Sequence, residues 1–219
     1  GPLSHLDAPD VGAARAAIAA ALDGGRETLT ETESKTCLTA FGIPVAASRV
    51  AADEDEAERI AAEIGLPVAM KVDSPDLVSK TDAGGVRLGV ASFEAVRNAH
   101  RGIREAVAGS RPDATVRGVA IEPMVVRANG RELAVSAHTD AVFGPLLGLG
   151  AGGRRGGSVR AHALPPLNDF LARDLMASTP VAPLLAATES RPAADTDALE
   201  AVLLRVSEML CELPEIRAL

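Results

Sequence analysis

The sequence predicts an α+β protein with two lobes built on largely antiparallel sheets, and three observations support this. Strand-length apolar runs and helix-length amphipathic stretches are intermixed along the 219 residues without strictly alternating. Apolar residues make up 47% of the chain and charged residues 24%, as in ordinary globular proteins. Turn-forming residues such as Asp82-Ala83-Gly84-Gly85 join neighbouring apolar runs, which favours hairpins.

Helical periodicity and capping residues locate the helices. Thr30 and Glu33 fit a capping box, Ser92 is a typical N-cap residue, and Gly42 and Gly65 end the helices that precede them. The helices are expected at residues 10–23, 30–41, 53–64, 92–108, 167–177 and 195–213.

Apolar or alternating runs locate the strands. They are expected at residues 46–50, 67–72, 86–90, 116–126, 131–137 and 142–149. His138-Thr139-Asp140 is expected to form the turn between the last two strands. Residues 148–167 are rich in glycine and carry three arginines, which predicts a flexible basic loop, and its segment 150–160 is expected to be mobile.

Composition excludes several classes of function. The net charge of −8 argues against general binding to nucleic acid, and the absence of Trp and Tyr argues against a platform for stacking bases. No apolar run approaches the ~18 residues of a membrane span, and the first residues lack the features of a signal peptide. Cys37 and Cys211 are expected to be reduced core residues, so a cytoplasmic protein is predicted.

The segment at residues 66–90 has the features of a phosphate site. A buried strand ends near Lys71, and a glycine-containing loop leads to the next strand. Glycines allow backbone N–H groups to approach phosphate oxygens, and lysine adds a point charge. The segment lacks a Walker sequence. The alternative is an ordinary hairpin with a surface lysine.

Four motifs in order resemble a known family. They are Glu33-Ser34-Lys35 with Phe41-Gly42-Ile43-Pro44-Val45, Gly65-Leu66-Pro67-Val68 up to Lys71, Ser74-Pro75-Asp76 with Lys80-Thr81-Asp82-Ala83-Gly84-Gly85-Val86, and Phe143-Gly144-Pro145 with Leu164-Pro165-Pro166-Leu167. Over residues 26–216 the chain resembles the ATP-grasp domain of ADP-forming acyl-CoA synthetases. The same domain occurs in bacterial lysine acetyltransferases that carry a synthetase-like body.

The resemblance implies two α+β lobes that grip a nucleotide, ATP or ADP, in a cleft. Lobe one is expected at about residues 46–122, and lobe two at about 123–219 together with 26–45. Residues 1–25 are expected to be a tag remnant and an N-terminal helix. The domain at 26–219 is expected to be truncated at its C-terminus, before a further metal-binding segment of the family.

The resemblance also implies roles for single residues. Lys35 and Lys71 would reach the phosphates under a flap at residues 80–86, of which Lys80, Gly84, Gly85 and Val86 are the expected contacts. Glu122 would accept from the adenine amino group, and the Met124–Val125 backbone would contact the ring edge. The alternatives are that Lys35 faces solvent and that Glu122 pairs with an arginine.

Further candidates are assigned to anion and metal binding. Arg154, Arg155 and Arg160 are candidate phosphate or anion ligands because guanidinium groups match such oxygens. Glu132 and Asp140 are candidate Mg²⁺ ligands by resemblance, or alternatively surface carboxylates.

Two departures from the family pattern concern the chemistry. Ser79 stands where the family flap carries a histidine of the phosphoryl relay, so no catalytic residue is assigned. An Arg-Gly run at 154–158 replaces a metal-binding glutamate, and an incomplete ligand set for Mg²⁺ is therefore expected.

Three hypotheses remain open. The chain is the nucleotide-binding domain of an ADP-forming acyl-CoA synthetase, or a degenerate regulatory domain attached to a protein lysine acetyltransferase, or a purely structural lobe. The first requires CoA, a small carboxylic acid and separate CoA-binding and ligase modules, and the second requires an acetyltransferase module. Under each, the isolated chain is expected not to form acyl-CoA.

Overall fold

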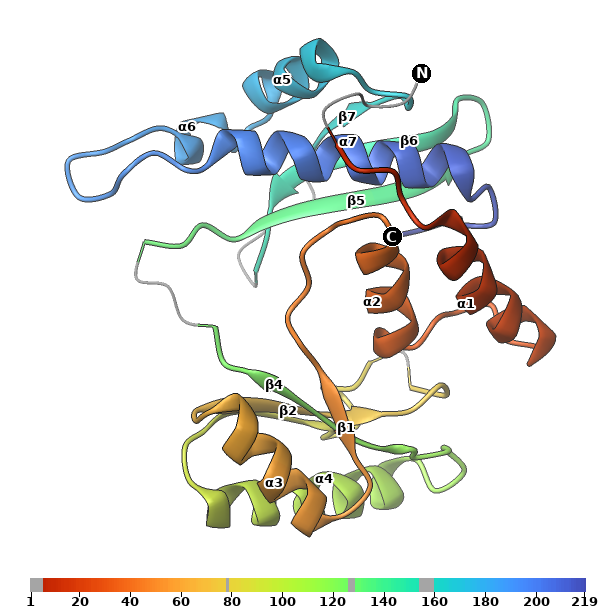
Figure 1. Cartoon of the computed structure of the whole chain (residues 1–219), viewed down its shortest axis with the longest axis vertical. Coiled ribbons are helices and arrows are strands. Elements are labelled where there is room, and N and C mark those ends of the chain that lie inside the picture. Colours follow the sequence, from red (N-terminus) through yellow and green to blue (C-terminus); the bar gives the residue numbers. More distant parts are fainter. Residues whose placement is uncertain (1–5, 78, 126–128, 154–159) are drawn as a thin grey trace. The chain divides into compact units, whose positions relative to one another are not determined.

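A computed structural model describes residues 6–77, 79–125, 129–153 and 160–219. The chain divides into two compact units (Figure 1). Unit 1 comprises Gly1–Ala16, Cys37–Ile43 and Arg127–Leu219, and unit 2 comprises Ala17–Thr36 and Pro44–Val126. All strand pairs are antiparallel in the part that the structure describes, which confirms the predicted α+β class.

Unit 2 contains a four-stranded sheet. Its strands, in spatial order, are β1 (Arg49–Ala51), β4 (Gly118–Pro123), β2 (Val68–Asp73) and β3 (Val86–Val90). Alternate residues of a strand point to opposite faces of a sheet. Val68, Met70 and Val72 of β2 therefore enter the hydrophobic core, whereas Ala69 and Lys71 point to the other face.

Two helices cover the core face of this sheet, α3 (Glu54–Ile64) and α4 (Phe93–Ser110) (Figure 1). Each helix has an N-cap: the side chain of Asp53 accepts from the Glu56 amide at 2.8 Å, and that of Ser92, as predicted, from the Ala95 amide at 3.1 Å. Because both helices lie on the core face, they do not cover the opposite face, which carries Lys71.

Unit 1 contains a three-stranded sheet and three helices. The elements are β5 (Leu133–Asp140), β6 (Gly144–Ala151), β7 (Arg160–Ala163), α5 (Asp169–Ser178), α6 (Ala182–Leu185) and α7 (Thr196–Glu212). α7 packs against β6, and α5 packs against both β7 and α7. Ala137, Leu147 and Leu149 share the buried face of the sheet, so the core of unit 1 lies between the sheet and these helices.

The N-terminal helices are α1 (Val11–Asp23) and α2 (Glu31–Ala40). The predicted capping box starts α2: the Glu33 amide donates to Thr30 Oγ1 at 3.3 Å, and the Thr30 amide donates to Glu33 Oε2 at 2.8 Å. Gly42, at φ 70°, follows the end of the helix, as predicted.

Several local expectations were wrong. β5 continues through His138 to Asp140, because the ladder with β6 extends to the Asp140–Gly144 pair, and the turn follows it. Part of the expected loop at 148–167 is strand, since β7 pairs with β6. Cys37 is buried as expected, but Cys211 is exposed.

Residues 26–36 belong to unit 2 rather than to the lobe at 123–219, where the sequence analysis put them. Ion pairs explain this placement. Lys35 contacts Glu122 of β4 at 2.5 Å, and Arg117 approaches Glu33 at 3.8 Å. The first turns of α2 are thereby tied to the unit 2 sheet.

In the described part of the chain, every helix is too short or too polar to cross a lipid bilayer.

Candidate functional site

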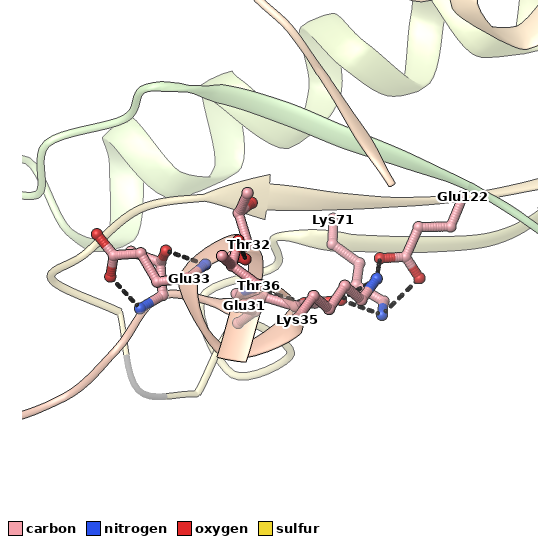
Figure 2. A network of polar contacts seen from close by, with 9 residues as sticks. Glu31, Thr32, Glu33, Lys35, Thr36, Lys71 and Glu122 are labelled. Atoms are coloured by element: carbon pink, nitrogen blue, oxygen red, sulfur yellow. Dashed lines mark hydrogen bonds and ion pairs between the residues drawn. The ribbon is translucent and has the colours of Figure 1, made fainter. Parts of the chain in front are cut away.

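A cluster of three lysines and two glutamates lies in unit 2 on the sheet face opposite to α3 and α4 (Figure 2). We call it the lysine cluster, and its members are Glu31, Lys35, Lys71, Lys80 and Glu122. Four segments supply them: the start of α2, strand β2, the β2–β3 loop and strand β4. Side chains up to 91 positions apart in the sequence therefore meet at one place.

All lysines of the protein belong to this cluster. The sequence contains only Lys35, Lys71 and Lys80, and the other 19 basic side chains are arginines. Lysine is a compact, strongly hydrated cation on a flexible stem, whereas arginine is a planar fork. The chain thus uses arginine elsewhere and places every primary side-chain amine at this one point.

Strand register positions the Lys71 and Glu122 side chains. Ala69 lies opposite Glu122 in the β2–β4 ladder, so Glu122 and Lys71 are diagonal neighbours on one face. The Lys71 ammonium donates to Glu122 Oε2 at 3.0 Å, and that of Lys35 donates to Oε1 at 2.5 Å (Figure 2). Each oxygen of the buried Glu122 carboxylate therefore binds one lysine.

Glu31 contacts all three lysines. Its Oε1 accepts from Lys71 at 2.9 Å and lies 3.3 Å from the Lys35 ammonium, and its Oε2 accepts from Lys80 at 2.7 Å. Burial by itself would raise the pKa of Glu31, but the ammonium groups outweigh it and hold that pKa well below the ordinary value. Glu31 is therefore an ionised acceptor at the centre of the cluster.

The same contacts affect Lys71. Burial by itself would lower its pKa, but the carboxylates of Glu31 and Glu122 more than compensate, so the pKa is raised. Lys71 is therefore an ammonium group and not a neutral amine, which suits electrostatic binding of an anion rather than nucleophilic attack.

The loop that carries Lys80 has a tightly packed conformation. A Cβ atom at Gly85 would lie 2.5 Å from Val72 Cγ1 and 3.0 Å from the Lys80 carbonyl oxygen, so only glycine fits there. The Gly85 amide donates to that same carbonyl at 2.8 Å, and Val86 pairs with Lys71 in the ladder. Backbone packing therefore fixes the start of β3 beside β2.

Ser79 and Gly84 belong to the same loop. Ser79 is exposed, and its Oγ accepts from the Asp82 amide at 3.4 Å. Gly84 has φ 70°, a conformation that favours glycine. The serine thus stands directly before Lys80, at the edge of the lysine cluster.

A second network anchors the start of α2. Arg26 donates to both oxygens of Glu33, at 2.8 and 2.7 Å, and Glu33 also closes the capping box with Thr30. The Arg26 hydrogen bonds lower the pKa of Glu33 to about 2. This network holds the helical turn from which Glu31 and Lys35 extend.

The contacts at the end of β4 and just after it differ from the role in adenine binding that the resemblance implies. The Met124 amide, expected to contact the edge of an adenine ring, donates to the Pro67 carbonyl at 3.1 Å. Val125 follows with its side chain 63% exposed. Glu122, expected to accept from the adenine amino group, instead has both oxygens bound by lysines. Its neighbours favour a role in holding the lysines.

The remaining candidates lie in unit 1, apart from the members of the cluster in the sequence. Asp140 accepts from the Val142 and Phe143 amides at 2.8 and 2.9 Å, so it stabilises the β5–β6 turn, and these bonds lower its pKa. Glu132 is exposed, with its carboxylate beside Gly153. The described residues contain no group of three or more metal-binding side chains.

The basic candidates are only partly described. Arg160 starts β7, and its Nε is buried without a hydrogen-bond partner among the described residues. Arg154 and Arg155 lie outside the described residues.

Sequence reasoning missed Glu31. The signal was present, because Glu31 precedes Lys35 by four positions, a spacing that brings two side chains together on a helix. Its contacts with Lys71 and Lys80 depend on how α2 packs on the sheet, and the local sequence does not encode this.

Comparison with known proteins identifies the family. The model of the ATP-grasp domain family matches residues 20–219. Over 191 residues, the chain is 35% identical to subunit beta of the ADP-forming acetate–CoA ligase I of Pyrococcus furiosus, covering 86% of this chain and 82% of that subunit. It is 32% identical to the ADP-forming 4-hydroxybutyrate–CoA ligase of Nitrosopumilus maritimus, over 89% of this chain but only 28% of that protein.

A solved structure agrees with the sequence comparison. The dinucleotide-forming acetyl-coenzyme A synthetase 1 of Ca. Korarchaeum cryptofilum, in complex with coenzyme A and Ca-AMPCP, aligns with a TM-score of 0.86 and 31% identity. The alignment covers 94% of this chain and 90% of that chain. These findings confirm the predicted ATP-grasp fold and the resemblance to acyl-CoA synthetases. The chain belongs to the ATP-grasp domain family and is homologous to the beta subunits of ADP-forming acyl-CoA synthetases.

Proposed function

We propose that the lysine cluster binds the polyphosphate of ATP or ADP. The convergence of Lys35, Lys71 and Lys80 from three segments is the observation that supports this most directly. Three ammonium groups face two carboxylates, so the cluster keeps one net positive charge in a protein of net charge −8. An acidic protein that binds a polyanion needs such locally placed cations.

The proposal assigns further roles around the phosphates. The loop at 80–86 lies over them, with Gly84, Gly85 and Val86 placing its backbone. Glu122 holds Lys35 and Lys71 side by side, and the Val125 backbone contacts the adenine edge. The two units correspond to the two lobes of the proposed nucleotide-binding domain.

The proposed reaction belongs to a larger assembly. Acid, CoA and ATP are converted to acyl-CoA, ADP and phosphate, with CoA-binding and ligase modules supplying what this chain lacks. The names of the relatives support this, since they are ADP-forming CoA ligases, one of them a beta subunit. The neighbouring structure binds coenzyme A and a nucleotide analogue together.

Residues for a metal ion do not come together in the described part of the chain. Asp140 is used by its turn, and Glu132 stands alone as an exposed carboxylate. The groups to which we assign the binding of the phosphates are therefore the three lysines.

Calorimetry with ATP, with and without Mg²⁺, tests the proposal. Lys71→Ala removes an ammonium group that the phosphates would contact, so we expect affinity to fall by about 1.5–3 kcal/mol, roughly 10- to 150-fold. Arg59→Ala is the matched control, because it removes the same charge from an exposed pair on α3. No binding by the wild type, or equal affinities for all three proteins, would refute the proposed site.

A second candidate function rests on Ser79. Serine at the relay position favours a regulatory domain that binds nucleotide without transferring phosphate, for example beside an acetyltransferase module. Incubation with γ-labelled ATP and Mg²⁺ separates the two. Acid-labile, base-stable label on the chain would indicate phosphohistidine and contradict the regulatory alternative, whereas no label is expected from it, even in Ser79→His.

A further inference from the structure

Glu31 has a position that the proposed function does not explain. One carboxylate accepts from or contacts the ammonium groups of Lys35, Lys71 and Lys80, at 3.3, 2.9 and 2.7 Å (Figure 2). These are the distances at which the same groups would bind phosphate oxygens. The Glu31 carboxylate therefore already provides what an anionic ligand would provide.

The two glutamates of the cluster are not equivalent. Glu122 lies within β4, and its side chain is 8% exposed, so it is fixed by the sheet. Glu31 is the first residue of α2, and its side chain is 23% exposed. Because Glu31 starts a helix and its side chain is partly exposed, we expect this side chain to move away from the lysines without disturbing the sheet.

The contacts of Lys80 show the same asymmetry. Among the described residues, Lys80 forms an ion pair with Glu31 alone, whereas Lys35 and Lys71 also contact Glu122. Loss of Glu31 would therefore release Lys80 entirely and leave the other two lysines held in place. Lys35 and Lys71 would therefore stay side by side on Glu122 without Glu31.

We propose that Glu31 is an internal competitor of the nucleotide: its carboxylate occupies the phosphate position, and a polyphosphate must displace it from the three lysines. This deepens the proposed function and rests on it. Glu31 then acts as a specificity determinant, because only a ligand with several negative charges replaces an ionised carboxylate held by three cations. A neutral nucleoside gains nothing from displacing it.

Binding measurements with Glu31→Gln test this inference. We expect ATP and inorganic tripolyphosphate each to bind at least about fivefold more tightly than to wild type, since 1 kcal/mol, the upper value for an exposed ion pair, is about a factor of five. Adenosine affinity should not change. Glu54→Gln is the matched control, because it also removes one negative charge but from the pair with Arg101. It should change ATP affinity by less than about twofold.

Glu31→Asp keeps the charge and guards against loss of folding in the glutamine variant. One methylene less withdraws the carboxylate from the lysines, so ATP should bind with an affinity between those of wild type and Glu31→Gln. If Glu31 only orders the lysines, the order reverses: wild type binds best, aspartate less well and glutamine worst. That order would overturn the inference.

The failure of the inference and that of the proposed function give different results. If Lys71→Ala weakens ATP binding but Glu31→Gln does not tighten it, the competitor role of Glu31 alone is refuted. If Lys71→Ala leaves the ATP affinity unchanged, both in the wild type and in the Glu31 variants, the site itself is refuted and the inference falls with it. Tighter tripolyphosphate binding by Glu31→Gln, lost again on adding Lys71→Ala, supports both.

Discussion

The exposed face of the unit 2 sheet and the corresponding face of the unit 1 sheet differ in what they place together. In unit 2 this face carries three lysines that share two carboxylates. In unit 1 it carries His138 and His162, whose rings meet edge to face at 5.7 Å over Gly148. The unit 2 face gathers three ammonium groups at one point, whereas among the described strands of unit 1 the register places the single cation Arg160, opposite Gly150, on the face of the two histidines. We infer that phosphate affinity resides in unit 2.

The largest expected effect is a loss of stability on removing the buried carboxylate of unit 2, compared with removing an exposed carboxylate of unit 1. Glu122→Ala removes the buried carboxylate that Lys35 and Lys71 share and leaves Glu31 as their remaining partner, and we expect the free energy of unfolding to fall by about 3 kcal/mol. Glu132→Ala removes an exposed side chain and should cost less than about 0.5 kcal/mol. Urea unfolding measures both, and equal losses would contradict the contrast between the two faces.

The packing of the loop beside Lys80 gives the next effect. Gly85→Ala brings a Cβ to 2.5 Å from Val72 Cγ1, so we expect a loss of about 2 kcal/mol through overpacking. Gly109→Ala in α4 meets nothing within 4 Å and should instead gain about 0.5–1 kcal/mol. Thermal unfolding of the two variants should move in opposite directions. A neutral Gly85→Ala would show that the loop adjusts freely.

Acid should weaken the anchor of α2 before it affects the interior. The Arg26 hydrogen bonds lower the pKa of Glu33 to about 2, against an ordinary value of 4.5. Because the folded pKa is the lower one, ionised Glu33 stabilises the fold above pH 4.5, and this contribution is lost as the pH falls toward about 2.

The pH dependence is measured by comparing wild type with Glu33→Gln. Between about pH 5 and pH 2.5, we expect the free energy of unfolding to fall by about 1 kcal/mol more in the wild type, because the variant has no carboxylate to protonate. Parallel profiles would show that the Arg26–Glu33 pair contributes nothing to stability.

Local sequence patterns predicted the parts of the fold that local physics controls. Three predictions agree with the structure: the capping box of Thr30 and Glu33, the N-cap Ser92 and the antiparallel class. The errors fell where long-range pairing decides, as in β7, which exists because β6 binds its backbone. Glycine-rich composition alone gave no sign of that partner.

The candidate site followed the same division. Lys71 was predicted because its strand and the following glycine loop are visible in the sequence. The joint role of Glu31 and Glu122 was not predicted, because it depends on ion pairs between the start of α2 and side chains of β2, β4 and the β2–β3 loop. Composition likewise did not reveal that two amides of the Asp140 turn bind Oδ1 of its carboxylate, and a role of Asp140 in metal binding stays a prediction.

Because all three lysines lie in the lysine cluster, amine chemistry reports on this site directly. We expect ATP to protect Lys35, Lys71 and Lys80 from acylation by an N-hydroxysuccinimide ester, read by mass spectrometry of each peptide, and adenosine to protect none of them. The N-terminal amine is the internal control and should react equally throughout. Calorimetry verifies that ATP is saturating. If all three lysines are then as reactive as without ATP, the claim that the cluster binds the phosphates is contradicted.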